Sequence, residues 1–121
     1  MSSIHRFTGD KAVFDYRWDG VQPKEYTNEE IKGVFTHVLV GPEDGAPNFI
    51  IRYFNLPVGK TTSYDQHLHE HGVVILHGQA KVQINDNFYT VGPMDSLFIS
   101  GNDIHQFTNI GETPLGFICV I

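Results

Sequence analysis

The sequence predicts an all-β domain whose strands form an antiparallel barrel. From Val34 onward, short apolar segments rich in β-branched and aromatic residues alternate with turn residues, which is the spacing of sandwiches and barrels. No interval between these segments accommodates the crossover helix of a parallel βαβ unit. The 121 residues, with nine Phe, five Tyr and one Trp, suffice for one packed core and are too few to indicate two domains.

The strands are expected in residues 34–121, and residues 1–33 are expected to form an N-terminal extension that packs on the barrel. In this extension Glu30 follows Thr27 by three residues, the spacing of a capping box. The chain there forms either a turn or two of helix or a polar loop, because the apolar pattern stops at Gly33. Strands are predicted at 34–40, 49–56, 61–68, 72–77, 79–84, 88–91, 96–100, 104–109 and 115–121.

Composition excludes several classes of function. Eight basic residues stand against 14 acidic ones, a formal charge of −6. The basic residues are scattered, so we expect no binding to DNA or RNA. A single cysteine, Cys119, excludes an internal disulfide and fits a reducing compartment. We find neither a signal peptide nor an apolar run long enough for a membrane span, and therefore expect a soluble cytoplasmic protein.

Four histidines predict a metal site. His67, His69 and His71 occupy alternate positions, and His105 lies in a later strand. Residues two apart share one face of a strand, and imidazole is the commonest protein ligand of transition metals. A straight strand would separate His67 from His71 by about 13 Å. Both reach one ion only if the chain bends between them.

Two segments resemble the paired motifs of the cupin superfamily. The first, PVGKTTSYDQHLHEHGVVILHG, has Gly59 and Gly78 at the spacing of the glycines that bound the first motif. The second, MDSLFISGNDIHQFTN, ends in His105 followed four residues later by Asn109. The resemblance covers roughly residues 49–119. It implies a single cupin domain over residues 1–121, folded as a cupin-type antiparallel β-barrel, also described as a double-stranded β-helix or jelly roll.

The ligand set implied by the resemblance departs from the family pattern. Asp65 holds the first ligand position, His67 the second and His71 the glutamate position, while His69 falls in the connecting turn. The resemblance implies His67, His71 and His105 as metal ligands, with either His69 or Asp65 as the fourth. His69 is favoured because the run His-x-His-x-His resembles a subgroup of small cupins. In the second motif, Met94-Asp95 replaces the usual Gly-Asp.

The metal is expected to be one divalent transition ion. Imidazole ligands suit Zn, Fe, Mn, Ni or Cu, and the sequence does not choose among them. Neutral imidazoles leave the ion its full positive charge, which strengthens its action as a Lewis acid and lowers the pKa of bound water.

Cys119 is the candidate catalytic residue outside the ligand set. We expect its strand to pair with the strand of His105 through a turn near residues 110–113, which would place the thiol close to His105. There it would be a pocket thiol, a metal ligand or a nucleophile, since a nearby cation favours the thiolate. The alternative is an inert cysteine packed in an apolar strand.

The remaining candidates have structural interpretations. His5, His37 and His77 are assigned as core or surface residues, although His77 shares the parity of the ligands and could line the pocket. Glu70 is either a base beside the metal or a solvated turn residue. Core packing is the preferred role of the strand aromatics, with barrel lining as the alternative; these are Tyr53, Tyr64, Phe98, Phe107 and Phe117.

The resemblance implies a metal-dependent enzyme that acts on a small oxygenated metabolite, of the dioxygenase, isomerase or lyase type. The alternative is a non-catalytic module that binds or senses a small molecule. The histidine run and the C-terminal Gly116-Phe117-Ile118-Cys119 also resemble the manganese-dependent cupin methylsulfurylases of methylthio-sugar phosphate salvage. Against this closer resemblance, few basic residues stand where they would hold a phosphate. Cupins commonly pair, so a homodimer is expected.

Overall fold

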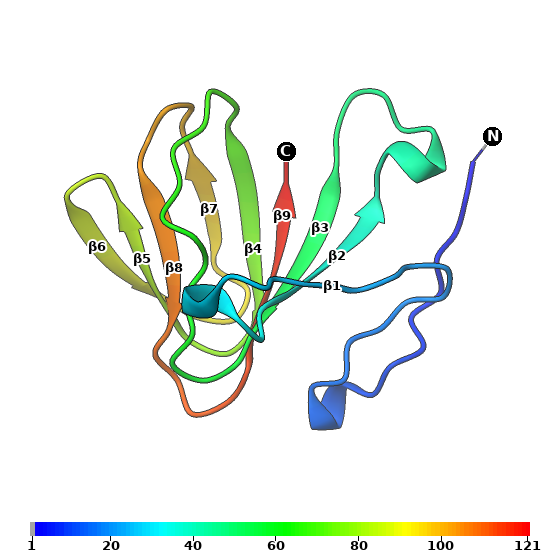
Figure 1. Ribbon diagram of the computed structural model, residues 1–121, viewed down its shortest axis with the longest axis horizontal. Helices are drawn as coiled ribbons and strands as arrows, with labels where there is room; N and C mark the ends of the chain where they lie inside the picture. Colours follow the sequence, from blue (N-terminus) through cyan, green and yellow to red (C-terminus); the bar gives the residue numbers. More distant parts are fainter. Residues whose placement is uncertain (1) are drawn as a thin grey trace.

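Two antiparallel sheets make up the computed structural model, which describes residues 2–121 apart from the side chain of Glu30 (Figure 1). The larger sheet has the strand order β1-β2-β3-β9-β4-β7, and the smaller one has the order β6-β5-β8. The strands are β1 (Lys24–Glu25), β2 (Phe35–Val40), β3 (Ile51–Leu56), β4 (His71–His77), β5 (Ala80–Ile84), β6 (Asn87–Val91), β7 (Ser96–Ile99), β8 (His105–Asn109) and β9 (Leu115–Val120). All pairings between these strands are antiparallel, which confirms the predicted fold class.

Eight of the nine predicted strands form, with ends within two residues of the prediction. The exception is 61–68, which pairs with β8 only through the isolated bridges Thr61↔Thr108 and Asp65↔His105. Between these bridges the Thr62 hydroxyl accepts the backbone N–H of Phe107 at 2.9 Å. A side chain thus takes the place of a regular ladder. The two-residue strand β1 was not predicted.

The short helical turns are all of the 3-10 type: η1 (Lys11–Val13), η2 (Glu29–Ile31) and η3 (Pro42–Asp44). The η2 turn lies where the capping-box spacing predicted a helix or a loop. The role expected of the Glu30 carboxylate lies outside the described residues. Across residues 2–121, no helix combines the length and apolar character that crossing a membrane requires.

The strand β9 lies in the middle of the larger sheet, paired with β3 on one side and β4 on the other. The prediction that it pairs with the strand of His105 is therefore wrong. The reason lies at Asn109, which is buried at the end of β8. Its side-chain amide donates to the carbonyls of Leu56 and Thr113 at 3.0 and 2.9 Å, and its oxygen accepts from Gly111 N–H. These bonds direct the chain from the smaller sheet across to the larger one.

A bulge in β4 moves His77 out of the pocket. The register against β9 shifts between Ile75 and His77, so that His77 lies opposite Gly116. His77 is therefore on the outer face, where Tyr53 O–H donates to its Nε2 at 2.7 Å and its Nδ1 donates to the Pro114 carbonyl at 2.8 Å. Burial lowers the pKa of His77. The neutral ring is thus fully hydrogen-bonded, as a core residue requires.

The N-terminal extension packs aromatic rings on the same outer face. Tyr16 stacks on Tyr53 with ring centroids 5.1 Å apart, and Trp18 contacts Tyr53 at 5.2 Å. The ring of Trp18 also meets the edge of His37, which is buried. This packing leaves the opposite face of the larger sheet to line a cavity.

A charged contact fixes the start of the extension to the loop after β2. His5 Nε2 lies 2.6 Å from Asp44 Oδ1, and the same oxygen accepts the Ser3 hydroxyl at 2.8 Å. The hydrogen bond to Asp44 raises the pKa of His5, and the hydrogen bond from His5 lowers the pKa of Asp44. The pair is charged when the pH lies between these two pKa values.

We predict that the extension is held most firmly within that window. A raised His5 pKa contributes stability that is lost as pH rises through it, above the usual 6.5. A lowered Asp44 pKa contributes stability that is lost as pH falls through it, below the usual 3.8. Limited proteolysis within residues 2–10 should accordingly be slowest in mild acid and speed up above neutral pH. Asp44→Asn should remove this dependence; a rate independent of pH in the wild type would contradict the assignment.

We also predict that Met94→Gly stabilises the protein. Met94 has a φ of 72° in the turn between β6 and β7, where the cupin motif usually has glycine. The left-handed region costs an L-residue roughly 1–2 kcal/mol, and part of the gain is offset by the entropy of glycine in the unfolded chain. The free energy of unfolding should rise by up to about 1 kcal/mol in urea titrations. Met94→Ala keeps the Cβ and should show no such gain.

Candidate metal centre

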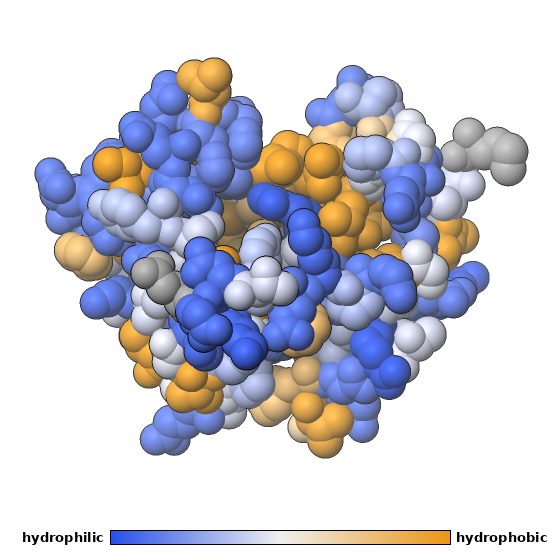
Figure 2. Space-filling model, in the orientation of Figure 1, coloured by the Kyte–Doolittle hydropathy of each residue, from blue (hydrophilic) through white to orange (hydrophobic). Residues whose placement is uncertain are grey.

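A cavity of about 80 Å³ lies between the two sheets. The molecule is hollowed there, with apolar side chains visible in the hollow (Figure 2). Its apolar lining includes Val73 of β4, Phe107 of β8 and Phe117 of β9. One water occupies roughly 10–15 Å³ of such space, so the cavity suits a small metabolite. Its polar lining includes Arg52, Asp65, His67, His71, His105 and Cys119.

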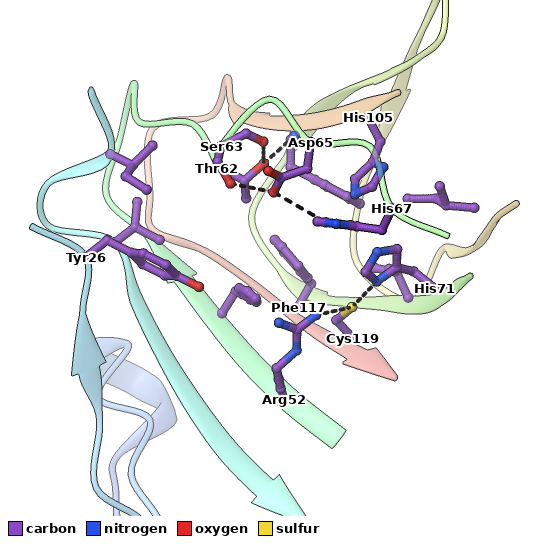
Figure 3. Close-up of a pocket in the computed structure, with 16 residues that line it drawn as sticks. Tyr26, Arg52, Thr62, Ser63, Asp65, His67, His71, His105, Phe117 and Cys119 are labelled. Atoms are coloured by element: carbon purple, nitrogen blue, oxygen red, sulfur yellow. Dashed lines mark hydrogen bonds and ion pairs between the residues drawn. The ribbon is translucent and has the colours of Figure 1, made fainter. Parts of the chain in front are cut away.

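Three of the predicted ligands converge at this cavity (Figure 3). His71 begins β4, His105 begins β8, and His67 comes from the irregular segment alongside β8. The ring centroids of His71 and His105 are 4.8 Å apart, and that of His67 lies 5.4 Å from His105 and 5.5 Å from His71. The bend required by the sequence argument thus comes from the irregular segment.

The two motif glycines permit this arrangement. Gly59 and Gly78 have φ values of 79° and 87°, which side-chain-bearing residues rarely adopt. A Cβ at Gly78 would also lie 2.7 Å from the Pro114 carbonyl oxygen. They thus turn the chain at both ends of the segment that carries His67, His69 and His71.

The ring nitrogens of His71 and His105 are oriented as metal ligands require. His105 Nδ1 donates to the Asp103 carbonyl at 2.9 Å, which leaves Nε2 free of that bond. His71 Nδ1 lies 3.2 Å from Cys119 Sγ, and its Nε2 is buried with no hydrogen-bond partner. Ligating histidines usually have the second nitrogen held in this way. A buried nitrogen without a partner costs free energy, and a divalent metal would satisfy it.

His71 is held in the form that binds metal. Burial, followed by the neighbouring His105, lowers the pKa of His71 to about 4. At neutral pH the ring is uncharged and the Nε2 lone pair is available. The donor set of three imidazoles therefore fits a divalent transition metal.

Two candidates for the fourth ligand, His69 and Asp65, both lie near His67. Ligand atoms of His67, His69 and His71 lie within 4.8 Å of one another, as do those of Asp65, His67 and His105. Ligands on opposite sides of an ion, each about 2.1 Å from it, are about 4.2 Å apart. The ligand atoms of either cluster therefore need to move only slightly closer together to hold a metal ion. His69 is exposed and stacks on His67 with centroids 4.7 Å apart, whereas Asp65 lines the cavity and accepts the Ser63 hydroxyl.

Cys119 lines the cavity although its strand pairs differently from the prediction. Its Sγ contacts His71 Nδ1 and also accepts a hydrogen bond from Arg52 Nη2 at 3.5 Å (Figure 3). Burial raises the pKa of the Cys119 thiol, and Arg52 opposes that effect. The thiol is therefore a neighbour of the ligand His71.

Arg52 is the charged cavity residue that the sequence analysis missed. It was counted among scattered basic residues, yet it shares the cavity with Phe54 two residues along β3. The sequence did contain a signal for this position. Side chains two residues apart on a strand point to the same face, so Arg52 lies on the inward face together with the apolar Phe54. Glu70 is exposed and lies outside the cavity lining. Of the strand aromatics, Phe107 and Phe117 line the cavity, whereas Tyr64 and Phe98 are exposed.

Comparisons with known proteins identify the family to which the chain is similar. The model of the family described as "Cupin domain" matches residues 52–121. The chain is 31% identical over 109 residues to a protein of Rhodospirillum rubrum named 1-methylthio-D-xylulose 5-phosphate methylsulfurylase, covering 88% of this chain and 69% of that protein.

Solved structures show the same fold. A cupin-2 domain protein from Rhodospirillum rubrum superposes with a TM-score of 0.80 at 30% identity, covering 95% of this chain and 75% of that one. A cupin 2 conserved barrel domain protein from Rhodopseudomonas palustris gives a TM-score of 0.76 at 29% identity, with coverage of 98% and 79%.

We predict that His67, His71 and His105 together hold the metal. Replacing any one by alanine should lower metal affinity by at least about 100-fold, since even outer partners of ligands contribute 10–100-fold. Metal content of purified protein after dialysis measures this. His5→Ala removes a histidine outside the cavity and should leave the content unchanged. Equal metal content in the wild type and a His67→Ala, His105→Ala double variant would refute the site.

A second pair of variants identifies the fourth ligand. We expect His69→Ala to weaken metal binding more than Asp65→Asn, because the run His67-x-His69-x-His71 resembles that of a subgroup of small cupins. Partial desolvation, followed by the neighbouring His67, lowers the pKa of His69 and so favours its neutral ring at neutral pH. The reverse order of affinities, measured by competition with a metal chelator, would assign the position to Asp65.

Proposed function

The chain belongs to the cupin superfamily, and from that premise we propose that it is a metal-dependent enzyme acting on a small oxygenated metabolite in the barrel cavity. The reaction is of the dioxygenase, isomerase or lyase type. The observation that carries the proposal is the convergence of His67, His71 and His105 on one cavity, with the buried Nε2 of His71 unpartnered. We further propose one divalent ion, Zn, Fe, Mn, Ni or Cu, held by these three residues and by His69 or Asp65.

The metal would act as a Lewis acid toward a carbonyl or enolate oxygen of the substrate. The protein's own groups perform the other tasks. Val73, Phe107 and Phe117 form apolar walls that limit water around the substrate. The hydrogen bond from His105 Nδ1 to the Asp103 carbonyl keeps that ring in one orientation.

Cys119 is the proposed reacting group beside the metal. With a metal held at Nε2 of His71, Nδ1 of the same ring would carry the proton and would donate a hydrogen bond to Cys119 Sγ. Two donors, His71 and Arg52, then face the sulfur, and hydrogen bonds to the charged form favour a thiolate. A thiolate in the cavity is a nucleophile or a base. The relative named as a methylsulfurylase, a name that refers to a sulfur-containing group, supports sulfur chemistry here.

The test of the function is metal analysis of protein purified without added metal, followed by turnover assays. Small hydroxy- or keto-metabolites, with and without phosphate or methylthio groups, would be the substrates. We expect metal-dependent turnover that chelation abolishes and re-addition restores. Metal-independent ligand binding without turnover would instead identify the alternative, a non-catalytic binding or sensing module.

The setting of the protein is also a proposal. We propose a cytoplasmic location, because a single cysteine, which can form no internal disulfide, fits a reducing compartment. The homodimer expected from the resemblance stays a prediction, for which light scattering is the measurement. Exposed Val74, Phe98 and Val120 on β4, β7 and β9 are apolar residues that such an interface would cover.

We predict that metal makes Cys119 more reactive. In the metal-loaded protein, alkylation of Cys119 near neutral pH should be roughly tenfold faster than in metal-free protein, because thiolate is the reacting form. Mass spectrometry of the labelled protein follows the rate. Cys119→Ser should keep its metal and lose turnover.

The opposite result has a clear form. If labelling is slow with and without metal, and the serine variant keeps full turnover, Cys119 is a packing residue. Its replacement would then cost stability alone, because a poorly paired hydroxyl is buried.

A further inference from the structure

Among the residues that the structure describes, the cavity contains a cation that forms no ion pair with a carboxylate. Arg52 lies on β3, and its Nε is buried without a hydrogen-bond partner. The ion pairs recorded among the described residues are His5–Asp44, Arg17–Asp15 and His67–Asp65, and none involves Arg52. An arginine inside a protein is usually paired with a carboxylate.

Neutral contacts hold the Arg52 side chain in place. Its guanidinium carbon lies 4.9 Å from the ring centroid of Phe54, a cation–π contact. One N–H, on Nη2, donates to Cys119 Sγ at 3.5 Å. In Figure 3 the guanidinium lies beside Cys119, on the same side of the cavity as His71. These contacts orient the group and leave Nε and the remaining N–H donors for something else.

We propose that Arg52 binds the anionic group of the substrate, so that the metabolite carries a phosphate or a carboxylate. This inference deepens the proposed function and rests on it, because the bound anion is a substrate only if the protein is an enzyme. A guanidinium offers two parallel N–H donors, which match two oxygens of either anion. Arg52 lines the same cavity as His67, His71 and His105. A small molecule can therefore place its anionic group on Arg52 and another oxygen at the histidines.

The charge of the chain makes this placement informative. The protein has a formal charge of −6, so a general excess of basic residues does not account for a cavity arginine that forms no ion pair with any described carboxylate. Tyr26 lines the same cavity and has a hydroxyl that can donate a further hydrogen bond to such a ligand. The sequence analysis found few basic residues placed to hold a phosphate, and Arg52 is one that the fold brings into the cavity.

The test is calorimetric titration of the full-length protein with inorganic phosphate and, separately, with acetate. Arg52→Met should weaken binding of the preferred anion at least tenfold, since a hydrogen bond to a charged group contributes enough for that factor. Arg6→Met removes an exposed arginine outside the cavity and should leave the affinity unchanged. Arg52→Lys keeps the charge and guards against misfolding; it should bind several-fold more weakly, because the ammonium lacks the paired donors.

The two anions distinguish the source of the charge. A loss confined to phosphate assigns a phosphorylated metabolite, and a loss confined to acetate, or shared by both anions, assigns a carboxylate-sized oxyanion site. Equal affinities in the wild type, Arg52→Met and Arg52→Lys would overturn the proposal, as would no binding of either anion at millimolar concentration. An Arg52→Met effect on Cys119 alkylation alone, with anion binding unchanged, would show that Arg52 serves only the thiol.

Repeating the titrations on chelator-treated protein separates this inference from the metal-dependent function. The difference between the wild type and Arg52→Met should persist without metal, although both bind more weakly. If the protein holds no metal and the difference persists, the proposed function fails and the anion site stands. If metal and turnover are present but the wild type and Arg52→Met bind the anion equally well, the proposed function stands and the anion site fails.

Discussion

The position of β9 between β3 and β4 is the constraint on which the rest of the molecule depends. Its backbone pairs along both edges, and without it the larger sheet would separate into two parts. The pairing also sets the chemistry, because Cys119 lies opposite Arg52 on one side and Val73 on the other. A shift of one residue in register would turn Cys119 to the outer face and Gly116 inward. The contacts among His71, Cys119 and Arg52 therefore follow from backbone hydrogen bonding.

The cavity contains polar groups whose burial destabilises the fold, and the packing of the surrounding core must offset that free energy. Within the described part of the chain, His71 Nε2 and Arg52 Nε are buried without hydrogen-bond partners, and Arg52 forms no ion pair. Such groups destabilise a fold unless a ligand satisfies them. Around them lie fully buried apolar side chains such as Leu56, Ile75 and Leu115. The arrangement is typical of a site prepared for its ligands, because groups that are fixed beforehand lose little entropy on binding.

The sequence predicted the fold class, eight of the strands and the convergence of three histidines, because these depend on local periodicity and on motif spacing. It failed where long-range geometry decides. The pairing of β9 depends on how Asn109 directs the chain between sheets, which no local pattern specifies. The face of His77 depends on a bulge that reverses the parity of β4 after Ile75. Arg52 was passed over because it was counted only among the scattered basic residues, whereas its place in β3 assigns it to the cavity.

The aromatic packing on the outer face has a spectroscopic consequence. Trp18 is the one tryptophan of the chain, and it contacts Tyr53 of β3 at 5.2 Å and Tyr16 at 6.3 Å. Light absorbed by these tyrosines will pass to the indole, whose emission responds to its exposure to water. The intrinsic fluorescence of the protein thus reports the docking of one segment onto one sheet, on the side away from the metal centre. Release of the extension can therefore be followed by tryptophan fluorescence, while changes at the metal centre are followed by a different signal in the same sample.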